Sequence, residues 1–352
     1  MTPSAANRQK EKNEQYFILF GNCIPVKGAS RSVIVDLQRE NMFFVSNDIY
    51  DLLSEMRKSS WGHITSSYNR SSTKQIGKVI DHLEANGLGF WTSTPDLFPQ
   101  IDMTWDSPSV ITNAIIDSGP GTRHNWKNIF KQLAELGCRD IQLRFFCRLP
   151  LSEMIAILNL LEGSFIKSVE IILQYSREYT KRALLKLVDE YIRIRTITLH
   201  GAPQDEIYLM NGGGRSRFMG NILFSSELVS DETHCGKISA AYFSISGVES
   251  FTESVNFNSC LNRKISVDKN GYIRNCPSLP GSYGHIGNTL LADAVTSEFS
   301  KVWGITKDHV SVCKDCEFRY VCTDCRAYTL SPQDHLGKPA KCRYNPYIAA
   351  WE

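Results

Sequence analysis

The hydrophobic positions of this chain follow three different patterns along its length. As far as Pro99, short apolar runs alternate with turn-rich segments and then give way to segments of helical period. The predicted strands are 16–20, 32–37, 41–46 and 89–94, and the predicted helices are 48–56, 61–68 and 73–85. Asn47 is the expected cap of the first helix and Gly87 the expected stop of the third.

From Trp105 to about Ser230, strand-like and helix-like runs alternate. The predicted strands are 109–116, 140–146, 168–175 and 196–200, and the predicted helices between them are 126–137, 152–163 and 180–192. Repeated strand–helix units of this kind imply a parallel sheet with helical crossovers. The pattern weakens after His200, where Gly212–Gly214 indicate a flexible loop and only 220–226 indicates another strand. We therefore expect a partial (β/α) barrel.

From Glu232 onward, regular periodicity fades. Residues 265–276 are expected to form a hairpin, because Asn270-Gly271 between two β-type runs is a strong turn signal. The rest is rich in loops, as expected where bound metal replaces an apolar core. The predicted fold class is α/β. It comprises a tail over 1–15, an N-terminal unit over 16–100, a degenerate partial (β/α) barrel over 101–231 and a loop-rich C-terminal domain over 232–352.

Composition excludes several classes of protein. The 352 residues are 42% hydrophobic and 22% charged, which is ordinary for a soluble globular chain of two or three domains. The net charge of +2 implies neither an acidic tail nor a broad field for nucleic acid. No apolar run is long enough to cross a membrane, and the polar N-terminal segment lacks the apolar core of a signal peptide. We expect a cytoplasmic protein with a disordered N-terminal tail.

Cysteine spacing carries the strongest chemical information in the sequence. Two Cys-x2-Cys pairs lie close together, and such pairs let two thiolates reach one metal from a tight turn, as zinc and iron–sulfur sites require. The array has too many candidate ligands for one four-coordinate ion. An odd total of 11 cysteines without an export signal disfavours a disulfide framework. The array consists of Cys260, Cys276, Cys313, Cys316, Cys322, Cys325 and Cys342.

This array resembles the SPASM domain of radical SAM peptide maturases. The signature of that domain is C-x(9–15)-G-x(4)-C, a gap, C-x(2)-C-x(5)-C-x(3)-C, a further gap and a final C. The one departure is Cys325, which follows Cys322 after two residues rather than three. The matching positions are Cys260, Gly271, Cys276, Cys313, Cys316, Cys322 and Cys342.

The resemblance implies two [4Fe–4S] clusters with interleaved ligands. Three cysteines of the array would hold the first cluster, and Cys235 in THCGKIS is the candidate for its fourth ligand because it begins the same segment. If Cys235 does not bind, the first cluster keeps an open iron to which a substrate could coordinate. The implied ligands are Cys235, Cys260, Cys276 and Cys325 for the first cluster, and Cys313, Cys316, Cys322 and Cys342 for the second.

The chain lacks the C-x(3)-C-x(2)-C loop on which radical SAM chemistry depends. The matching first strand, VITNAIID, is followed by SGPGTRHNWKN without a cysteine, and RFFCRLP after the second strand lacks Gly-Gly-Glu. Three thiolates that leave one iron free are what allow SAM to chelate and be cleaved. We therefore expect no SAM cofactor and no reductive SAM cleavage by this chain alone.

The whole chain resembles the SPASM-domain peptide maturases of the grasp-with-spasm type, a family that fits both the presence of the cysteine array and the absence of the C-x(3)-C-x(2)-C loop. FGNCIPVKGASRS, WDSPSVITNAIID, CLNRKISVD and CKDCEFRYVCTDCRAY carry this resemblance. Such proteins are encoded beside an ATP-grasp ligase and a short precursor peptide. The resemblance therefore implies these two partners and work on a ribosomally made peptide, without assigning a catalytic residue.

The N-terminal strands and helices resemble a small winged helix-turn-helix, which can read DNA or grip a peptide by strand addition. Helix 73–85 carries two lysines against one aspartate and one glutamate, whereas a DNA-reading helix needs a denser basic stripe. We therefore expect a leader peptide, not nucleic acid, between strand 42–45 and this helix. The candidate contacts are Met42, Phe43, Phe44, Val45, Gln75, Lys78, Val79 and His82.

Simpler interpretations remain beside these. The array could hold structural zinc, although its two Cys-x2-Cys pairs are closer together than in a zinc ribbon. Cys138 and Cys147 suit small buried side chains, and Cys23 suits either that role or a reactive thiol. The leading hypothesis is an iron–sulfur protein that binds a precursor peptide and supports its modification by cluster redox or Lewis-acid chemistry. The alternatives are a non-catalytic adaptor that presents the peptide to the ligase, and a redox or oxygen sensor.

Overall fold

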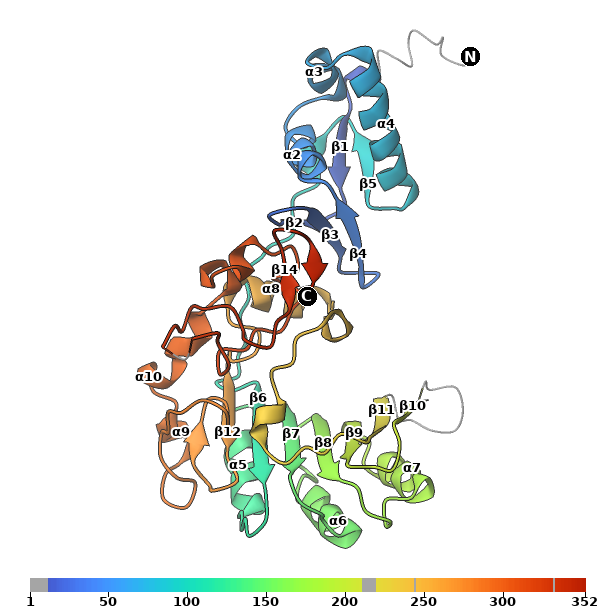
Figure 1. The fold of residues 1–352 in the computed structure, drawn as a ribbon. Coiled ribbons are helices and arrows are strands. Elements are labelled where there is room, and N and C mark those ends of the chain that lie inside the picture. Colours follow the sequence, from blue (N-terminus) through green and yellow to red (C-terminus); the bar gives the residue numbers. More distant parts are fainter. Residues whose placement is uncertain (1–11, 211–219, 244, 332) are drawn as a thin grey trace.

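The computed structural model describes residues 12–210, 220–243, 245–331 and 333–352. The N-terminal unit lies at one end, a large sheet at the other, and the loop-rich C-terminal segment between them (Figure 1). The loop predicted at Gly212–Gly214 and most of the predicted tail lie outside the described residues. Near the end of that predicted tail, the Lys12 ammonium lies 4.9 Å from the ring centroid of Trp91.

The N-terminal unit contains two small antiparallel sheets. β1 (Tyr16–Leu19) pairs with β5 (Gly89–Thr92), and the second sheet has the order β2 (Cys23–Lys27), β3 (Ser32–Asp36), β4 (Asn41–Val45). β2 was not predicted from the sequence, because Pro25 lacks a backbone N–H and indicates a turn. As an edge strand, β2 tolerates this proline.

Three helices follow: α2 (Asn47–Met56), α3 (Trp61–Ser66) and α4 (Arg70–Ala85). The prediction that Asn47 caps α2 was wrong, because the Ser46 hydroxyl accepts the hydrogen bond from the Ile49 N–H. The Asn47 side chain instead accepts a hydrogen bond from Ser32, 2.7 Å away, and so ties α2 to β3. α4 starts earlier than predicted because Asn69 caps it, and Gly87 ends this stretch with a φ of +64°.

The central part of the chain forms the predicted parallel sheet. The strands are β6 (Asn113–Ser118), β7 (Asp140–Phe145), β8 (Ser168–Gln174) and β9 (Ile194–His200), and the connecting helices are α5 (Trp126–Glu135), α6 (Leu151–Asn159) and α7 (Lys181–Glu190). β11 (Gly220–Ser225) pairs parallel with β9, and β10 (Glu206–Met210), which was not predicted, pairs antiparallel with β11.

The predicted hairpin is present and belongs to the same sheet. β12 (Lys264–Val267) pairs antiparallel with β13 (Ile273–Arg274) and parallel with β6. Gly271 occupies the turn with a φ of +86°, a conformation that favours glycine. The whole sheet has eight strands in the order β10-β11-β9-β8-β7-β6-β12-β13, so it is mostly parallel and open at both ends.

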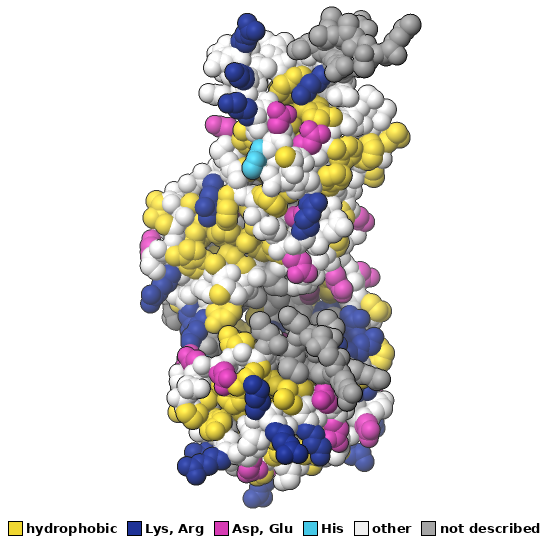
Figure 2. Space-filling view, turned by 90° about the vertical axis from the view of Figure 1, so that its right-hand side faces the viewer, with side chains coloured by type: hydrophobic (Ala, Val, Ile, Leu, Met, Phe, Trp, Pro, Cys, Tyr) yellow, Lys and Arg dark blue, Asp and Glu magenta, His cyan; other side chains and the backbone are white. Residues whose placement is uncertain are grey.

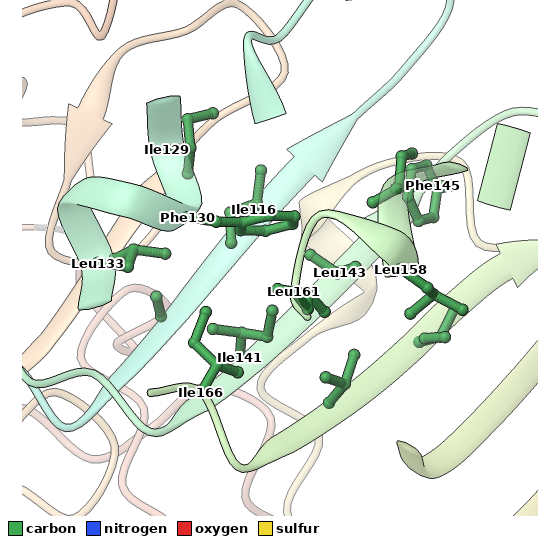
Figure 3. Close-up of a cluster of buried hydrophobic side chains, with 14 of the residues drawn as sticks. Ile116, Ile129, Phe130, Leu133, Ile141, Leu143, Phe145, Leu158, Leu161 and Ile166 are labelled. Carbon is green, nitrogen blue, oxygen red and sulfur yellow. The ribbon is translucent and has the colours of Figure 1, made fainter. Parts of the chain in front are cut away.

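The largest apolar core lies between this sheet and its helices. Side chains of β6 and β7 meet those of α5 and α6, as Figure 3 shows for Ile116, Phe130, Leu143 and Leu158, all of which are buried. Burying a side chain of this size contributes about 2 kcal/mol of transfer free energy. Burial alternates along β8, where Glu170 is exposed between the buried Val169 and Ile171, so one face of this part of the sheet is covered more completely than the other.

The C-terminal segment has short regular elements separated by loops, as expected from its sequence. These elements include α8 (Gly247–Asn256), α9 (Leu291–Ala294), α10 (Ser297–Ser300), β14 (Tyr344–Asn345) and β15 (Ala350–Trp351). Valines of β2 and β3 pack against Phe318 and Tyr344 in a separate apolar cluster. The Arg31 guanidinium bonds the buried Glu317 carboxylate at 2.7 Å, so the N-terminal sheet is docked on this segment. Within the described residues, no helix is long and apolar enough to cross a membrane.

Candidate metal centre

Four cysteines of the C-terminal segment line one small cavity. Cys313, Cys316, Cys322 and Cys342 share it with the aromatic rings of Phe318, Tyr344 and Trp351. The Cys316 N–H bonds the Cys313 carbonyl at 3.0 Å, and the Cys322 N–H bonds the Phe318 carbonyl at 3.0 Å. Consecutive tight turns therefore bring Cys313, Cys316 and Cys322 to the same wall, and Cys342 reaches the cavity from the C-terminal end of the chain. We call these four residues set 2.

The backbone is strained beside set 2. Val312 precedes the turn that carries Cys313, and its φ is +67°. A β-branched residue in this region is an outlier that costs on the order of 1–3 kcal/mol and persists only where its surroundings fix it. This strain was not predictable from the sequence, because valine is not a residue that favours a left-handed conformation.

Burial raises the pKa of three set 2 thiols, those of Cys313, Cys316 and Cys322. Burial raises the pKa of Cys313 to about 12, and nearby Asp324, Cys322 and Cys342 act in the same direction. Burial also raises the pKa of Cys322 to about 12, and Lys307 opposes this rise. Lys307 is only 3% exposed, and its ammonium bonds the Ser259 hydroxyl at 3.0 Å. Set 2 thus has a buried cation beside it.

The other four candidate cysteines are also neighbours. Burial, together with the neighbouring Cys260 and Cys235, raises the pKa of Cys276 to about 12. Cys325 has its pKa raised by burial and then by the same two thiols. Cys235 itself is exposed. The next residue, Gly236, passes so close to Cys325 that a Cβ added to this glycine would lie 2.9 Å from the Cys325 sulfur. We call Cys235, Cys260, Cys276 and Cys325 set 1.

Set 1 has a cation of its own. The Lys264 ammonium donates a hydrogen bond to the Cys260 sulfur at 3.5 Å. Burial alone would lower the pKa of Lys264, but the negative charges that Cys260, Cys276 and Cys235 can carry outweigh burial and raise it. Lys264 is the first residue of β12, so the large sheet positions this side chain. Neither Lys264 nor Lys307 was a candidate from the sequence, because a single lysine carries no ligand spacing.

A buried polar link joins the loops of the two sets. The Asn258 side chain accepts a hydrogen bond from the Cys260 N–H at 3.1 Å and donates one to Asp324 at 2.7 Å. Asp324 lies between Cys322 and Cys325, so Asn258 connects the loop that carries Cys260 to the segment that serves both sets. Within the described residues, no three His, Cys, Asp or Glu side chains converge closely enough to hold one metal ion.

The remaining cysteines lie apart from both sets. Cys23 and Cys138 are buried and Cys147 is half-buried. Burial raises the pKa of Cys23 to about 12, and burial raises that of Cys138 to about 12 as well. A raised pKa suppresses the thiolate, so these environments favour inert thiols, including at Cys23, for which a reactive role was also considered.

The candidate peptide contacts divide between two faces of β4. Phe43 and Val45 pack into the apolar cluster of the N-terminal helices, together with Val79 of α4. Met42 and Phe44 face the C-terminal segment, and the Phe44 ring lies 5.8 Å from that of Phe318. Successive strand residues alternate in direction, so one groove does not receive all of them. The other candidates on α4, Gln75, Lys78 and His82, are exposed.

The backbone of β4 nevertheless offers a free edge. In the three-stranded sheet, β4 pairs with β3 on one side, and no described strand pairs with its other side. The N-terminal end of the molecule also exposes large apolar side chains, and hydrophobic patches are visible on the upper part of the face in Figure 2. These exposed side chains include Phe20, Phe44, Leu97 and Phe98.

No family model and no curated protein matches the sequence. The structure of SuiB from Streptococcus suis bound to S-adenosylmethionine aligns with 92% of this chain and 98% of its own, at 10% identity and a TM-score of 0.39. Another SuiB structure aligns over the same shares at 10% identity and a TM-score of 0.31. At these values the likeness carries no argument about ligands or activity.

Proposed function

We propose that this chain is an iron–sulfur protein of the SPASM type that assists the maturation of a ribosomally made peptide together with an ATP-grasp ligase. The observation that carries the proposal is the grouping of eight cysteines into set 1 and set 2, each beside one partly or fully buried lysine. The resemblance to SPASM domains implies the same grouping for seven of these cysteines, and Cys235 is the candidate for the fourth ligand of the first cluster. The ATP-grasp partner rests on the sequence resemblance alone.

The residues present suit iron–sulfur clusters. Set 2 is enclosed by aromatic rings, and both sets consist of thiol ligands, which are the donors that such clusters require. An all-thiolate [4Fe–4S] site is an anion, so Lys264 and Lys307 would each offset part of its charge. When bound, clusters supply electron transfer, or a Lewis-acid iron if ligation is incomplete. The chain itself would fix their positions and exclude water from set 2.

Peptide recognition is the second part of the proposal. The free edge of β4 could accept an added strand, with main-chain hydrogen bonds supplying affinity. Lys78 and His82 on α4 are exposed and could contact the side chains of such a peptide. Because Phe44 contacts Phe318 beside set 2, a peptide on β4 would lie near the proposed clusters.

The decisive experiment measures iron and acid-labile sulfide per chain after anaerobic purification. We expect about eight of each, as two [4Fe–4S] clusters require. One or two zinc ions without sulfide would overturn the iron–sulfur proposal and leave a zinc-containing adaptor. A Cys235→Ala variant then tests set 1: retention of all iron would show that Cys235 is not a required ligand.

Peptide binding requires a separate measurement. Binding of a precursor peptide, which the sequence resemblance implies is encoded beside this gene, is measured by fluorescence anisotropy with wild type and Lys78→Glu. We expect weaker binding in this variant and no change in Lys186→Glu, a matched exposed lysine on α7. Equal affinities for all three proteins would contradict a site at α4. If the peptide is still modified after the clusters are removed, the adaptor function is favoured.

A further inference from the structure

A cavity opens at the carboxyl ends of β6 and β7, next to the turn between β12 and β13. Its volume is about 630 Å³, which is in the range of small-molecule sites. In open α/β sheets, ligands bind in crevices outside the carboxyl ends of parallel strands. Residues 120–125 form one wall, and residues 269–271 and 285–287 form the opposite one.

The charged side chains that line the cavity are all positive. Arg123 and Lys269 line the cavity, and no aspartate or glutamate is among the described residues that do so. The Lys269 ammonium lies 3.7 Å from the Glu232 carboxylate. Arg123 is exposed and has no hydrogen-bonding or ionic partner in the part of the chain that the structure describes. One guanidinium is therefore available to a ligand.

Carboxylates close to the cavity in sequence are already neutralised. Asp117 bonds Arg144 at 2.6 Å. Asp268 bonds Arg274 at 2.8 Å. Each aspartate is therefore neutralised by its own arginine and does not compete for Arg123. The electrostatic potential of the cavity thus favours an anion.

The walls are held by bonds that do not require a ligand. The Thr122 hydroxyl donates to the Lys269 carbonyl at 2.7 Å and accepts from the Gly119 N–H at 2.9 Å. A ring nitrogen of His124 lies 2.7 Å from the Asp117 carbonyl, and one of His285 lies 3.0 Å from the Asn270 carbonyl. Both histidines are thus engaged with the backbone. The cavity is therefore preorganised, which lowers the conformational-entropy cost of binding.

We propose that this cavity binds a small molecule through a phosphate or carboxylate group, with Arg123 as its principal donor. A guanidinium presents a planar fork of N–H groups that matches either oxyanion with two parallel hydrogen bonds. Asn125, the cap residue of α5, also lines the cavity, so the positive end of that helix faces the same space. The inference does not depend on the proposed clusters, because no residue of set 1 or set 2 lines the cavity.

Isothermal titration calorimetry of the anaerobically purified full chain tests this site. Inorganic pyrophosphate probes the phosphate source and glutarate the carboxylate source, both in chloride buffer at low ionic strength. We expect saturable binding of at least one probe, weakened at least tenfold in Arg123→Gln, because charge-assisted hydrogen bonds are lost. Lys127→Gln, which removes an exposed cation of α5 outside the cavity lining, is expected to bind like wild type.

The outcomes separate the alternatives. Binding of pyrophosphate alone identifies a phosphate ligand, and binding of glutarate alone identifies a carboxylate ligand. Absence of saturable binding for both probes overturns the proposal, and so does equal weakening in both variants. A Lys269→Gln variant provides a second check, since removing the second cavity-lining cation should also weaken binding. Unchanged affinity in both Arg123→Gln and Lys269→Gln would place the anion elsewhere.

Discussion

The parallel sheet and the segment that carries the cysteines are built in different ways. In the sheet, most buried side chains are apolar, as Leu143 and Ile171 are, and they lie on regular strands, with buried polar groups such as the Asp117–Arg144 ion pair as exceptions. In the described residues between Thr306 and Cys342, regular structure is limited to single turns, and the buried side chains include charged ones. These charged side chains are Lys307, Glu317, Asp324 and Arg326. The sheet is thus stabilised by apolar burial, whereas the cysteine segment depends on polar contacts and, in our proposal, on bound clusters.

Removing one proposed ligand should give the largest effect. In Cys316→Ser we expect about half of the iron to be lost, together with at least ~3 kcal/mol of stability, because the binding free energy of a structural metal site is also folding free energy. Iron analysis and anaerobic denaturant unfolding measure both quantities. Cys147→Ser, which alters a half-buried cysteine outside both sets, should keep wild-type iron. Equal iron in both variants would remove Cys316 from the ligand set.

Creating a void in the apolar core of the sheet should lower the free energy of unfolding without changing the iron content. Leu143 of β7 is fully buried, and Leu143→Ala should cost about 3–4 kcal/mol of unfolding free energy. Iron per folded chain should not change, because none of the proposed ligand cysteines belongs to the apolar core that contains Leu143. Leu160→Ala, at a side chain that is 40% exposed, should change stability by less than about 1 kcal/mol. Loss of iron in Leu143→Ala would show that the two regions are coupled.

Mild acid should weaken the sheet through His200, which ends β9. Burial lowers the pKa of His200, which is fully buried, and the Val229 N–H donates to its Nδ1. The unfolded chain therefore binds a proton at higher pH than the folded one. The stability contributed by neutral His200 is complete above a pH of about 6.5 and falls as the pH drops below it.

The change between pH 7 and pH 5.5 should be on the order of 1 kcal/mol, as measured by urea unfolding at each pH. His200→Gln should reduce this slope. Burial also lowers the pKa of His124, so a smaller slope of the same sign should remain. An unchanged slope would mean that His200 contributes nothing to acid sensitivity.

The smallest expected effect lies where the two regions meet. Lys264 belongs to β12 of the sheet and donates a hydrogen bond to Cys260 of set 1. Reduction adds an electron, so removing this cation in Lys264→Met should lower the midpoint potential of one cluster by on the order of 50 mV. Redox titration followed by electron paramagnetic resonance would measure it. Lys307→Met should lower the midpoint potential of the other cluster. A change in the potential of the same cluster in both variants would contradict the assignment of one lysine to each set.

The same contrast explains what could be predicted from the sequence. The parallel strands and crossover helices were predicted because each buries a local apolar run or stripe. β10 was missed because its exposed Ile207 and the glycine run after it weaken a strand pattern. The pairing of β12 with β6 was also missed. It joins residues far apart in the chain, and such contacts leave no local pattern.

In the candidate site, the ligand sets came from spacing and family resemblance, while their surroundings could not be predicted. Lys264, Lys307 and Asn258 are single polar residues without a motif, and their role depends on where the loops meet in space. Arg123 lies in the loop where a cysteine motif was sought, and its lack of a partner is visible only in three dimensions. The side chains of β4 were expected to share one groove, although their alternation was predictable from strand geometry.

The parallel pairing of β12 with β6 has a consequence for how this protein can be divided. Because that pairing supplies backbone partners to β6, a chain truncated near residue 230 would leave a central strand of the sheet as a bare edge, which promotes aggregation. The detached C-terminal fragment would lose the neighbour that orders the strand between Cys260 and Cys276. The cysteine segment is therefore not a cassette that recombination or protein engineering could transplant alone. A transplant would need to carry β6 with it.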